Sequence, residues 1–503
     1  MQNDGSFKVR IRQGSATYDL SVKKGENLLY ALQKNGVPVP SPCAGNGRCK
    51  KCAVRIKGQS EEILLSCRTT VTSDLEGELL FGSEGDIVSV TAESSDNASN
   101  ISGITAIAAD LGTTTIALAL IDRESGRVID TVSTVNPQRR FGSDVISRVE
   151  QASSGGAHEL KKLAAKGLKE GMELLINRNP EAAKKLDSAA VSGNTCMLNL
   201  LTGKDVTGLM SYPFTAPVPS LEKCSLKELI SVDLPDIPLF ILPGKSGFIG
   251  ADAVSGLLSL GFNDNEKVNA LIDIGTNAEM AVGNRDKILT ASAAAGPAFE
   301  GGNLKFGTAG IPGAISGVKI TGKRAEIRTI GNVMPPVGIC GTGALEALSE
   351  LFTSGLMDET GLLTEEFFDE GFPLFSSGDE RSIVLSEDDI RELQLAKAAI
   401  RAGFELLLKG FGISADNIDK LYLSGGFGYF LDPVKAGNIG LIPKDLVSRT
   451  VNAGNTSLAG TIRFLKEGQE AEEKLEALLQ KTEELILSAD SEFNDRFLEE
   501  MGF

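Results

Sequence analysis

Two stretches of the chain, ITAIAADLGTTTIALALIDRESGRVIDTVS at residues 104–133 and NALIDIGTNAEMAVGNRDKILTASA at residues 269–293, follow one pattern. Each begins with an apolar strand that ends in an aspartate, passes through a tight Gly-Thr turn into a second apolar strand, and then turns into a third. The two aspartates, Asp110 and Asp273, lie 163 positions apart. With helical sequence expected after each copy, this long-range repeat predicts two similar α/β lobes that face one another across a cleft.

Both Asp-x-Gly-Thr turns combine groups that suit a magnesium–phosphate ligand. A carboxylate at the end of a strand can hold the waters around Mg²⁺, and the following turn presents N–H and hydroxyl groups to phosphate oxygens. One such turn would mean little, but two at corresponding points of a repeat are strong support. The chain has no G-x-x-x-x-G-K-[ST] motif, which excludes a P-loop ATPase. We therefore expect ATP and Mg²⁺ at Asp110, Gly112, Thr113 and Thr114 and at Asp273, Gly275, Thr276 and Asn277.

A third glycine-rich element, LYLSGGFGYFLDP, occupies residues 421–433. Its glycines let the backbone approach a flat purine and ribose, which makes Gly425, Gly426 and Phe427 candidate contacts of the nucleotide. Together with the two turns it resembles the superfamily of actin, sugar kinases and acetate kinase, which binds ATP between two ribonuclease-H-like lobes. The resemblance covers residues 104–503. It implies further cleft-lining segments and two further nucleotide contacts: AVSGNT (190–195) with Asn194, the crossing helix GADAVSGLLSLG (250–261), and GICGTGALEALSEL (338–351) with Gly341.

Four of the seven cysteines gather between residues 43 and 67, with spacings C-x₅-C-x₂-C and then fourteen residues to the last. Thiolates grouped in this way suit an iron–sulfur cluster or zinc. A zinc ribbon usually offers two C-x₂-C knuckles, whereas here three cysteines share one glycine-rich loop that can wrap a flat cluster. We expect a [2Fe–2S] cluster on Cys43, Cys49, Cys52 and Cys67, with zinc or plain core cysteines as alternatives. The isolated Cys196, Cys224 and Cys340 are expected to be ordinary buried residues.

The sequence around these cysteines predicts a small β-rich domain over residues 1–92. FKVRIRQ and ATYDLSVK form the arms of an expected hairpin, and a short helix is expected at 27–35. This resembles the plant and adrenodoxin-type [2Fe–2S] ferredoxins over about residues 6–90, which implies an α+β, β-grasp, ferredoxin-like fold. The gap before Cys67 is shorter than in most of those proteins. A polar stretch at 93–103 predicts a linker, so the expected lobes are 104–262 and 263–503.

Composition excludes several classes of function. The net charge of −17 opposes nucleic-acid binding, no apolar run is long enough for a membrane span, and the N-terminus has no apolar signal core, so we expect a cytoplasmic protein. The single histidine, His158, lies in a polar stretch and is expected at the surface. Residues 1–92 carry a net charge of +2 and the remainder −19. Four cations close to the cysteines either raise the potential of a cluster or dock an acidic partner: Arg48, Lys50, Lys51 and Arg55.

A ferredoxin module followed by an actin-like ATPase resembles the reductive activators of corrinoid enzymes, ATP-dependent reductases that rescue oxidised corrinoid proteins in methyl-transfer systems of anaerobes. The segments AAAGPAFEGGN (293–303) and LAKAAIRAGFELLL (395–408) agree with it. The resemblance implies that ATP use between the lobes drives one electron from the cluster onto a corrinoid protein, which converts Co(II) to Co(I), and that an upstream low-potential donor refills the cluster. Larger members carry an extra domain before the ATPase, so the short linker here leaves the oligomeric state unpredicted.

No histidine lies in the predicted cleft, so a carboxylate must activate the hydrolytic water unless positioning and Mg²⁺ suffice. Asp252, at the head of the crossing helix, and Glu300, after Gly-Pro, are the candidates. The opposing interpretations are a helix cap for Asp252 and a turn contact for Glu300. Two other classes of function stay open, a redox-gated kinase of a small molecule and a non-enzymatic actin-like interaction protein. ATP hydrolysis that rises only with a corrinoid protein would favour the activator.

Overall fold

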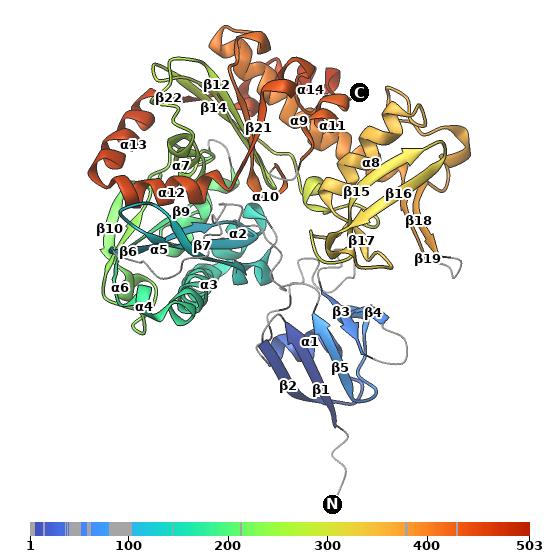
Figure 1. The fold of residues 1–503 in the computed structure, drawn as a ribbon, viewed down its shortest axis with the longest axis horizontal. Helices are drawn as coiled ribbons and strands as arrows, with labels where there is room; N and C mark the ends of the chain where they lie inside the picture. The colour runs from blue at the N-terminus through green and yellow to red at the C-terminus, as the bar shows by residue number, and fades with distance from the viewer. Residues whose placement is uncertain are drawn as a thin grey trace, which may run out of the picture.

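The computed structural model describes residues 6–13, 16–35, 37, 39, 52–57, 62–79, 103–142, 144–211, 214–377, 381–428 and 431–503. The N-terminal domain holds one five-stranded sheet with the order β2-β1-β5-β3-β4 and the helix α1 (Figure 1). Its first two strands form the expected antiparallel hairpin, and β5 runs parallel to β1. Its elements are β1 (Ser6–Gln13), β2 (Ala16–Lys23), α1 (Leu28–Lys34), β3 (Ala53–Ile56), β4 (Glu62–Leu65) and β5 (Leu75–Leu79).

The first copy of the repeat builds the six-stranded sheet β10-β11-β9-β6-β7-β8. The strand that ends near Asp110 is central: it pairs antiparallel with β7 and parallel with β9, and it is buried along almost its whole length. Burial on both faces explains its continuous apolar sequence. The strands are β6 (Thr105–Leu111), β7 (Thr115–Asp122), β8 (Val128–Val135), β9 (Leu186–Gly193), β10 (Glu222–Ser225) and β11 (Pro238–Ile241).

The second copy repeats this arrangement in the sheet β21-β20-β12-β13-β14-β22. Here the strand that carries Asp273 pairs antiparallel with β13 and parallel with β20. The two sheets therefore place their aspartates at equivalent points, and the predicted two-lobed architecture is confirmed. The strands are β12 (Asn269–Ile274), β13 (Ala278–Gly283), β14 (Ile288–Ala293), β20 (Leu421–Ser424), β21 (Thr450–Gly454) and β22 (Thr482–Glu484).

The second lobe departs from the expected pattern after its third strand. Helical sequence was expected there, but only the short turn η5 (Ala298–Glu300) follows β14, and a separate three-stranded sheet of order β16-β15-β17 comes before the next long helix, α8. We call this sheet with its connecting loops, residues 309–340, the β15–β17 module (Figure 1). Its strands, and those of a hairpin farther on, are β15 (Ala314–Thr321), β16 (Arg324–Thr329), β17 (Gly338–Ile339), β18 (Phe372–Ser377) and β19 (Arg381–Leu385).

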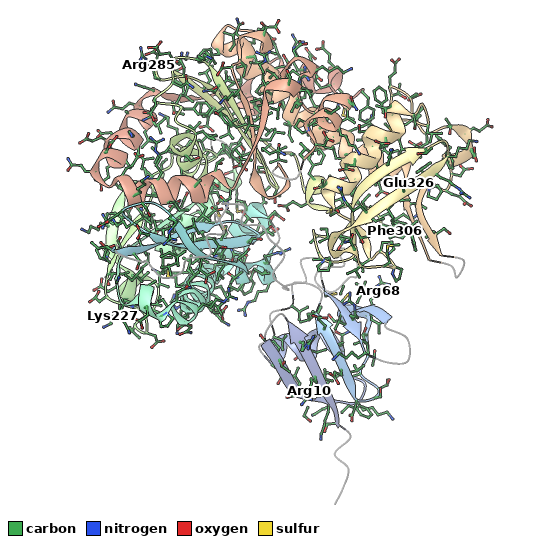
Figure 2. All side chains as sticks on the ribbon, in the orientation of Figure 1. Arg10, Arg68, Lys227, Arg285, Phe306 and Glu326 are labelled. Carbon is green, nitrogen blue, oxygen red and sulfur yellow. The ribbon has the colours of Figure 1, made fainter. Side chains whose placement is uncertain are left out.

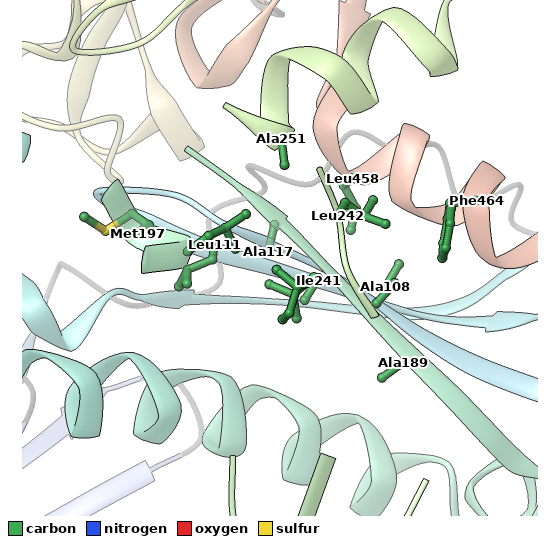
Figure 3. Close-up of a cluster of buried hydrophobic side chains, with 14 of the residues drawn as sticks. Ala108, Leu111, Ala117, Ala189, Met197, Ile241, Leu242, Ala251, Leu458 and Phe464 are labelled. Carbon is green, nitrogen blue, oxygen red and sulfur yellow. The ribbon is translucent and has the colours of Figure 1, made fainter. Parts of the chain in front are cut away.

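Two helices near the C-terminus pack in a core that includes residues of both lobes. Leu458 and Phe464 of α12 belong to the same buried cluster as Ala108 and Leu242 (Figure 3), and Leu475 of α13 joins them. This cluster also contains Leu271, Ala281 and Ile288 of the second sheet, so the two helices lie in a core that both lobes share, and the second lobe has a further cluster of its own. The helices are α2 (Val145–Gln151), α3 (Ala157–Arg178), α4 (Pro180–Ala183), α5 (Thr195–Thr202), α6 (Leu226–Leu229), α7 (Ala251–Ser259), α8 (Gly341–Thr353), α9 (Glu387–Phe411), α10 (Gly425–Gly428), α11 (Pro433–Asn438), α12 (Thr456–Glu467), α13 (Gln469–Lys481) and α14 (Phe493–Glu499).

Two expectations from composition concern single features of this fold. Within the described ranges, no helix has both the length and the apolar character that crossing a membrane requires. His158 lies in the first turn of α3 and is exposed, as its polar surroundings predicted.

Candidate nucleotide and iron–sulfur sites

The two aspartates of the repeat lie close enough to influence one another although they come from different lobes. Burial raises the pKa of Asp110, and it raises the pKa of Asp273 to about 6, with a further contribution from the charge of Asp110. Both residues keep some solvent-accessible surface. The fold thus brings two strand-terminal carboxylates from positions 163 residues apart into one electrostatic environment.

Two further carboxylates complete this group. Asp252 lies in the first turn of α7 and accepts a hydrogen bond from the backbone N–H of Ala253 at 2.9 Å. Burial, and then the charge of Asp110, raise the pKa of Asp252 to about 7. Glu279 on β13 is the register partner of Asp273, and burial together with the charges of Asp252 and Asp273 raises its pKa well above the usual range. We call Asp110, Asp252, Asp273 and Glu279 the carboxylate group.

The carboxylate group has the chemistry of a site for a hydrated hard cation. Like charges that raise one another's pKa are relieved when a cation lies among them. In the part of the chain that the structure describes, no three carboxylate, cysteine or histidine side chains converge closely enough to ligate one ion together. Mg²⁺ keeps several of its waters and often uses only one or two carboxylates directly.

Neighbouring side chains hold the first Gly-Thr turn in place through hydrogen bonds. Gly112 donates its N–H to the carbonyl of Thr115 at 3.0 Å and closes the turn, and the amide of Asn194 donates to the hydroxyl of Thr113 at 2.9 Å. Asn194 also caps α5, since its side chain accepts from the N–H of Met197. The fully buried Arg148 donates to the carbonyl of Thr113. Thr113 and Asn194, both predicted as nucleotide contacts, thus lie within hydrogen-bond distance of one another, while Arg148 was not predicted.

The second turn has a simpler support. Gly275 donates its N–H to the carbonyl of Asn277 at 2.8 Å, which closes the turn. The hydroxyl of Thr276 donates to a carboxylate oxygen of Glu300 at 3.2 Å, which links this turn to η5. The two predicted residues Thr276 and Glu300 therefore touch. Glu300 holds a turn residue here, which is the contact that its structural interpretation anticipated.

Glycine is required at two of the predicted nucleotide positions because other atoms come very close. Gly425 has a φ of +86°, and a Cβ there would lie 2.5 Å from a carboxylate oxygen of Asp273. A Cβ on Gly341, the first residue of α8, would lie 1.7 Å from the carbonyl oxygen of Phe299. The α10 turn, which also contains Gly426, therefore lies directly against Asp273. The side chain of Phe427 lies outside the described residues.

Two residues that donate hydrogen bonds to Asp110 were not predicted from the sequence. The amide of Asn455 and the hydroxyl of Ser457 each donate to Asp110 at 2.8 Å, and both hydrogen bonds lower the pKa of Asp110 against the effect of burial. Asn455 is the N-cap of α12 and also accepts from the N–H of Leu458. An Asn before a helix predicts a cap, but only the returning helix shows that this cap meets the first lobe. Glu279 was missed for a related reason, since it follows from strand register alone.

Two of the four predicted cluster cysteines lie in the described part of the iron–sulfur domain, while Cys43 and Cys49 lie outside it. Cys52 is buried and directly precedes β3, and its carbonyl accepts from the N–H of Ser66 at 2.9 Å. Cys67 follows β4 in the turn η1 (Ser66–Arg68), and its carbonyl accepts from the side chain of Asn27. The antiparallel β3–β4 pair thus brings these two cysteines to one end of the sheet. Among the other cysteines, Cys196 and Cys340 are buried as expected, and Cys224 is only partly buried.

Three family models match consecutive parts of this chain. Residues 11–72 match the 2Fe-2S iron-sulfur cluster binding domain, residues 105–265 match the RACo middle region, and residues 267–503 match the C-terminal domain of RACo, the ASKHA domain. The match at the N-terminus includes Cys43, Cys49, Cys52 and Cys67. The other two models cover both copies of the Asp-x-Gly-Thr repeat.

Individual proteins resemble most or nearly all of the chain. The corrinoid activation enzyme RamQ of Eubacterium limosum is 28% identical and covers 92% of this chain and 94% of its own. A [Co(II) methylated amine-specific corrinoid protein] reductase of Methanosarcina barkeri is 28% identical over 79% of this chain and 76% of its own. The solved structure of a reductive activator for corrinoid, iron-sulfur protein is 26% identical, with a TM-score of 0.70 over 99% of this chain and 98% of its own.

Proposed function

Since the chain belongs to the family of reductive activators of corrinoid proteins, we propose that it uses ATP to transfer one electron from an iron–sulfur cluster to a corrinoid protein, which reduces inactive Co(II) to Co(I). One observation carries this proposal. A single chain joins a ferredoxin-like domain to two lobes whose repeat aspartates, Asp110 and Asp273, meet in one carboxylate group. An electron carrier and a nucleotide site in one chain are what an energy-driven one-electron transfer needs.

The electron is assigned to the N-terminal domain. Four thiolates at Cys43, Cys49, Cys52 and Cys67 would hold a [2Fe–2S] cluster, which supplies reversible one-electron chemistry when bound. The burial of Cys52 keeps its side of the site away from bulk water. An upstream low-potential donor must reload the domain after each transfer, and a corrinoid protein of a methyltransferase system is the proposed acceptor.

The nucleotide is assigned to the region where the two repeat turns meet. The hydroxyl of Thr113 accepts from Asn194, which leaves its proton for a phosphate oxygen. The hydroxyl of Thr276 donates its proton to Glu300, so this turn would meet phosphate through backbone N–H groups. Asp110 and Asp273 would accept hydrogen bonds from the waters of a magnesium ion, which would neutralise phosphate charge there. Gly425 packs directly against Asp273 and Ile274, which brings the α10 turn beside the proposed magnesium–phosphate site.

We infer different roles for the two candidate catalytic carboxylates. Glu300 bonds to the Thr276 hydroxyl, so it positions the second turn. Asp252 lies in the carboxylate group, where its charge interacts with those of Asp110 and Asp273, so it is the candidate that can orient a water beside the nucleotide. We therefore assign water activation to Asp252 and a positioning role to Glu300.

The test is an anaerobic assay with candidate corrinoid proteins, in which the cobalt spectrum is followed with and without ATP. We expect Co(I) to appear only when reduced protein, corrinoid protein and ATP are all present. A Cys52→Ala variant serves as the matched control, because it should still hydrolyse ATP but reduce no cobalt. Equal cobalt reduction with and without ATP, or transfer of phosphate to a metabolite, would contradict the proposal.

A further inference from the structure

One residue of the iron–sulfur domain is buried by a different part of the chain. Val54 on β3 belongs to the core of its own domain, and its neighbour Ala53 points to the opposite face of the strand, as alternation along a strand requires. Ala53 is nevertheless only 3% exposed. It belongs to an apolar cluster with Ile311, Ala314 and Cys340 of the β15–β17 module, so that module covers it.

The contact involves the end of the domain where the cluster ligands lie. Ala53 directly follows Cys52, and its partner across the β3–β4 pair is Leu65, two residues before Cys67. Leu65 packs against the same apolar cluster, with Ala309, Ile330 and Val337 on the other side. Figure 1 shows β3 and β4 at the edge of the domain nearest to the module, and Figure 2 shows Arg68 on this side and Arg10 on the far side. We call this contact the docking interface.

On the other side, the docking interface is joined directly to a predicted nucleotide residue. Cys340 donates its N–H to the carbonyl of Ile315 at 3.0 Å and is the N-cap of α8, whose first residue is Gly341. Gly341 packs against the backbone of Phe299 so closely that a Cβ could not be accommodated. A shift of α8 must therefore move both η5 and the surface on which Ala53 rests.

The same packed path ends at the second phosphate turn. Glu300 follows Phe299 in η5 and accepts a hydrogen bond from Thr276 at 3.2 Å.

We propose that the docking interface is a nucleotide-sensitive contact: occupation of the turn at Thr276, transmitted through Glu300, Gly341 and Cys340, changes how firmly the iron–sulfur domain is held against the β15–β17 module. Release would expose the Cys52–Cys67 end of the domain to an electron partner. This step rests on the proposed nucleotide site. Two sites are coupled only if both bias the same element, and here that element is the segment from Cys340 into α8.

The test uses hydrogen–deuterium exchange of the full chain, read at residues 53–57 and 309–340, with and without a non-hydrolysable ATP analogue. Ala53→Glu places a charge in the docking interface and should speed exchange in both segments about tenfold without nucleotide. The matched control is Ser21→Glu on β2, at the opposite edge of the same sheet and exposed. Because Ala53 adjoins a cluster ligand, Ile330→Glu repeats the test from the module side, with the exposed Thr321→Glu as its control.

In the unaltered chain we expect the analogue to change exchange at residues 53–57, and we expect this response to disappear in Ala53→Glu and Ile330→Glu. Calorimetry on the same samples measures analogue binding separately. Binding without any change at 53–57 would overturn the coupling and leave the proposed function intact. Absence of binding would overturn the proposed nucleotide site itself. Exchange equal to that of the controls in both interface variants would overturn the docking interface.

Discussion

Asp273→Asn tests two expected effects of the carboxylate group: it lowers the stability of the nucleotide-free protein, and it supports ATP hydrolysis. In the nucleotide-free protein, burial and the charge of Asp110 raise the pKa of Asp273 from 3.8 to about 6. The folded state therefore binds more protons than the unfolded state between these two values, and stability falls as the pH rises from about 4 through about 6. The difference corresponds to at most about 3 kcal/mol above pH 7. Asparagine has nearly the same shape as aspartate but no charge, so Asp273→Asn removes this loss of stability.

We therefore expect Asp273→Asn to raise the melting temperature of the nucleotide-free protein at pH 8. The gain per kcal/mol is about 2–4 °C for lobes of this size, and the difference from the unaltered protein should vanish near pH 4. The same variant should lose ATP hydrolysis by about 10²–10³, as loss of about 3–4 kcal/mol of transition-state charge stabilisation predicts. The cluster spectrum should not change, because the iron–sulfur domain has its own core.

The assays are calorimetric melting between pH 4 and pH 8 and phosphate release at saturating Mg·ATP. Asp369→Asn, at an exposed aspartate of the same lobe, is the matched control and should change neither quantity. Hydrolysis at the unaltered rate in Asp273→Asn would refute the assignment of the nucleotide to this region. A melting temperature lowered equally at pH 4 and pH 8 would refute the reasoning about charge.

Three further predictions concern other parts of the molecule. Cys52→Ala and Cys67→Ala should each strip or destabilise the cluster while ATP hydrolysis survives, because domain and lobes have separate main cores; one zinc and no sulfide per chain would reject the cluster. Asn455→Ala removes one of two hydrogen bonds to Asp110 and should lower kcat/KM for ATP about tenfold, about 1.4 kcal/mol; an unchanged value would show that the bond carries no function. Reversing Lys50 and Lys51 to Glu should slow association with an acidic partner, less so at high salt; unchanged association with a shifted midpoint potential would support potential tuning instead.

The sequence predicted the features that depend on local pattern. Asp110 and Asp273 could be found because each ends an apolar strand before a Gly-Thr turn. The repeat of this pattern predicts that both strand ends lie at equivalent points of two similar sheets. Glu279 could not be found in this way, since a glutamate in a strand ordinarily faces solvent and only the register with Asp273 places it in the carboxylate group. Local pattern fixes where a strand ends, while the residue that faces that end depends on tertiary pairing.

The helices show the same limit at a larger scale. The apolar spacing of α12 and α13 indicates that each buries one face, but not which core receives it. Leu458 and Leu475 lie in a cluster that includes strands of both lobes, which chain order alone does not predict. The β15–β17 module was missed because its strands interrupt the expected β-β-β-α order, and neither lobe requires it for its own sheet.

The return of α12 has a mechanical consequence for the carboxylate group. The chain leaves the second-lobe sheet at Gly454, whose φ is +70°, and enters α12 at Thr456. Between these points lies Asn455, which caps the helix and donates to Asp110 of the first lobe. A rotation of one lobe against the other must therefore turn about Gly454 or break the bond to Asp110. Gly454→Ala strains this left-handed backbone position. We therefore expect it to impair lobe closure and ATP turnover more than nucleotide binding. A stopped-flow comparison of nucleotide association with phosphate release measures the two effects, and an equal loss in both would place the pivot elsewhere.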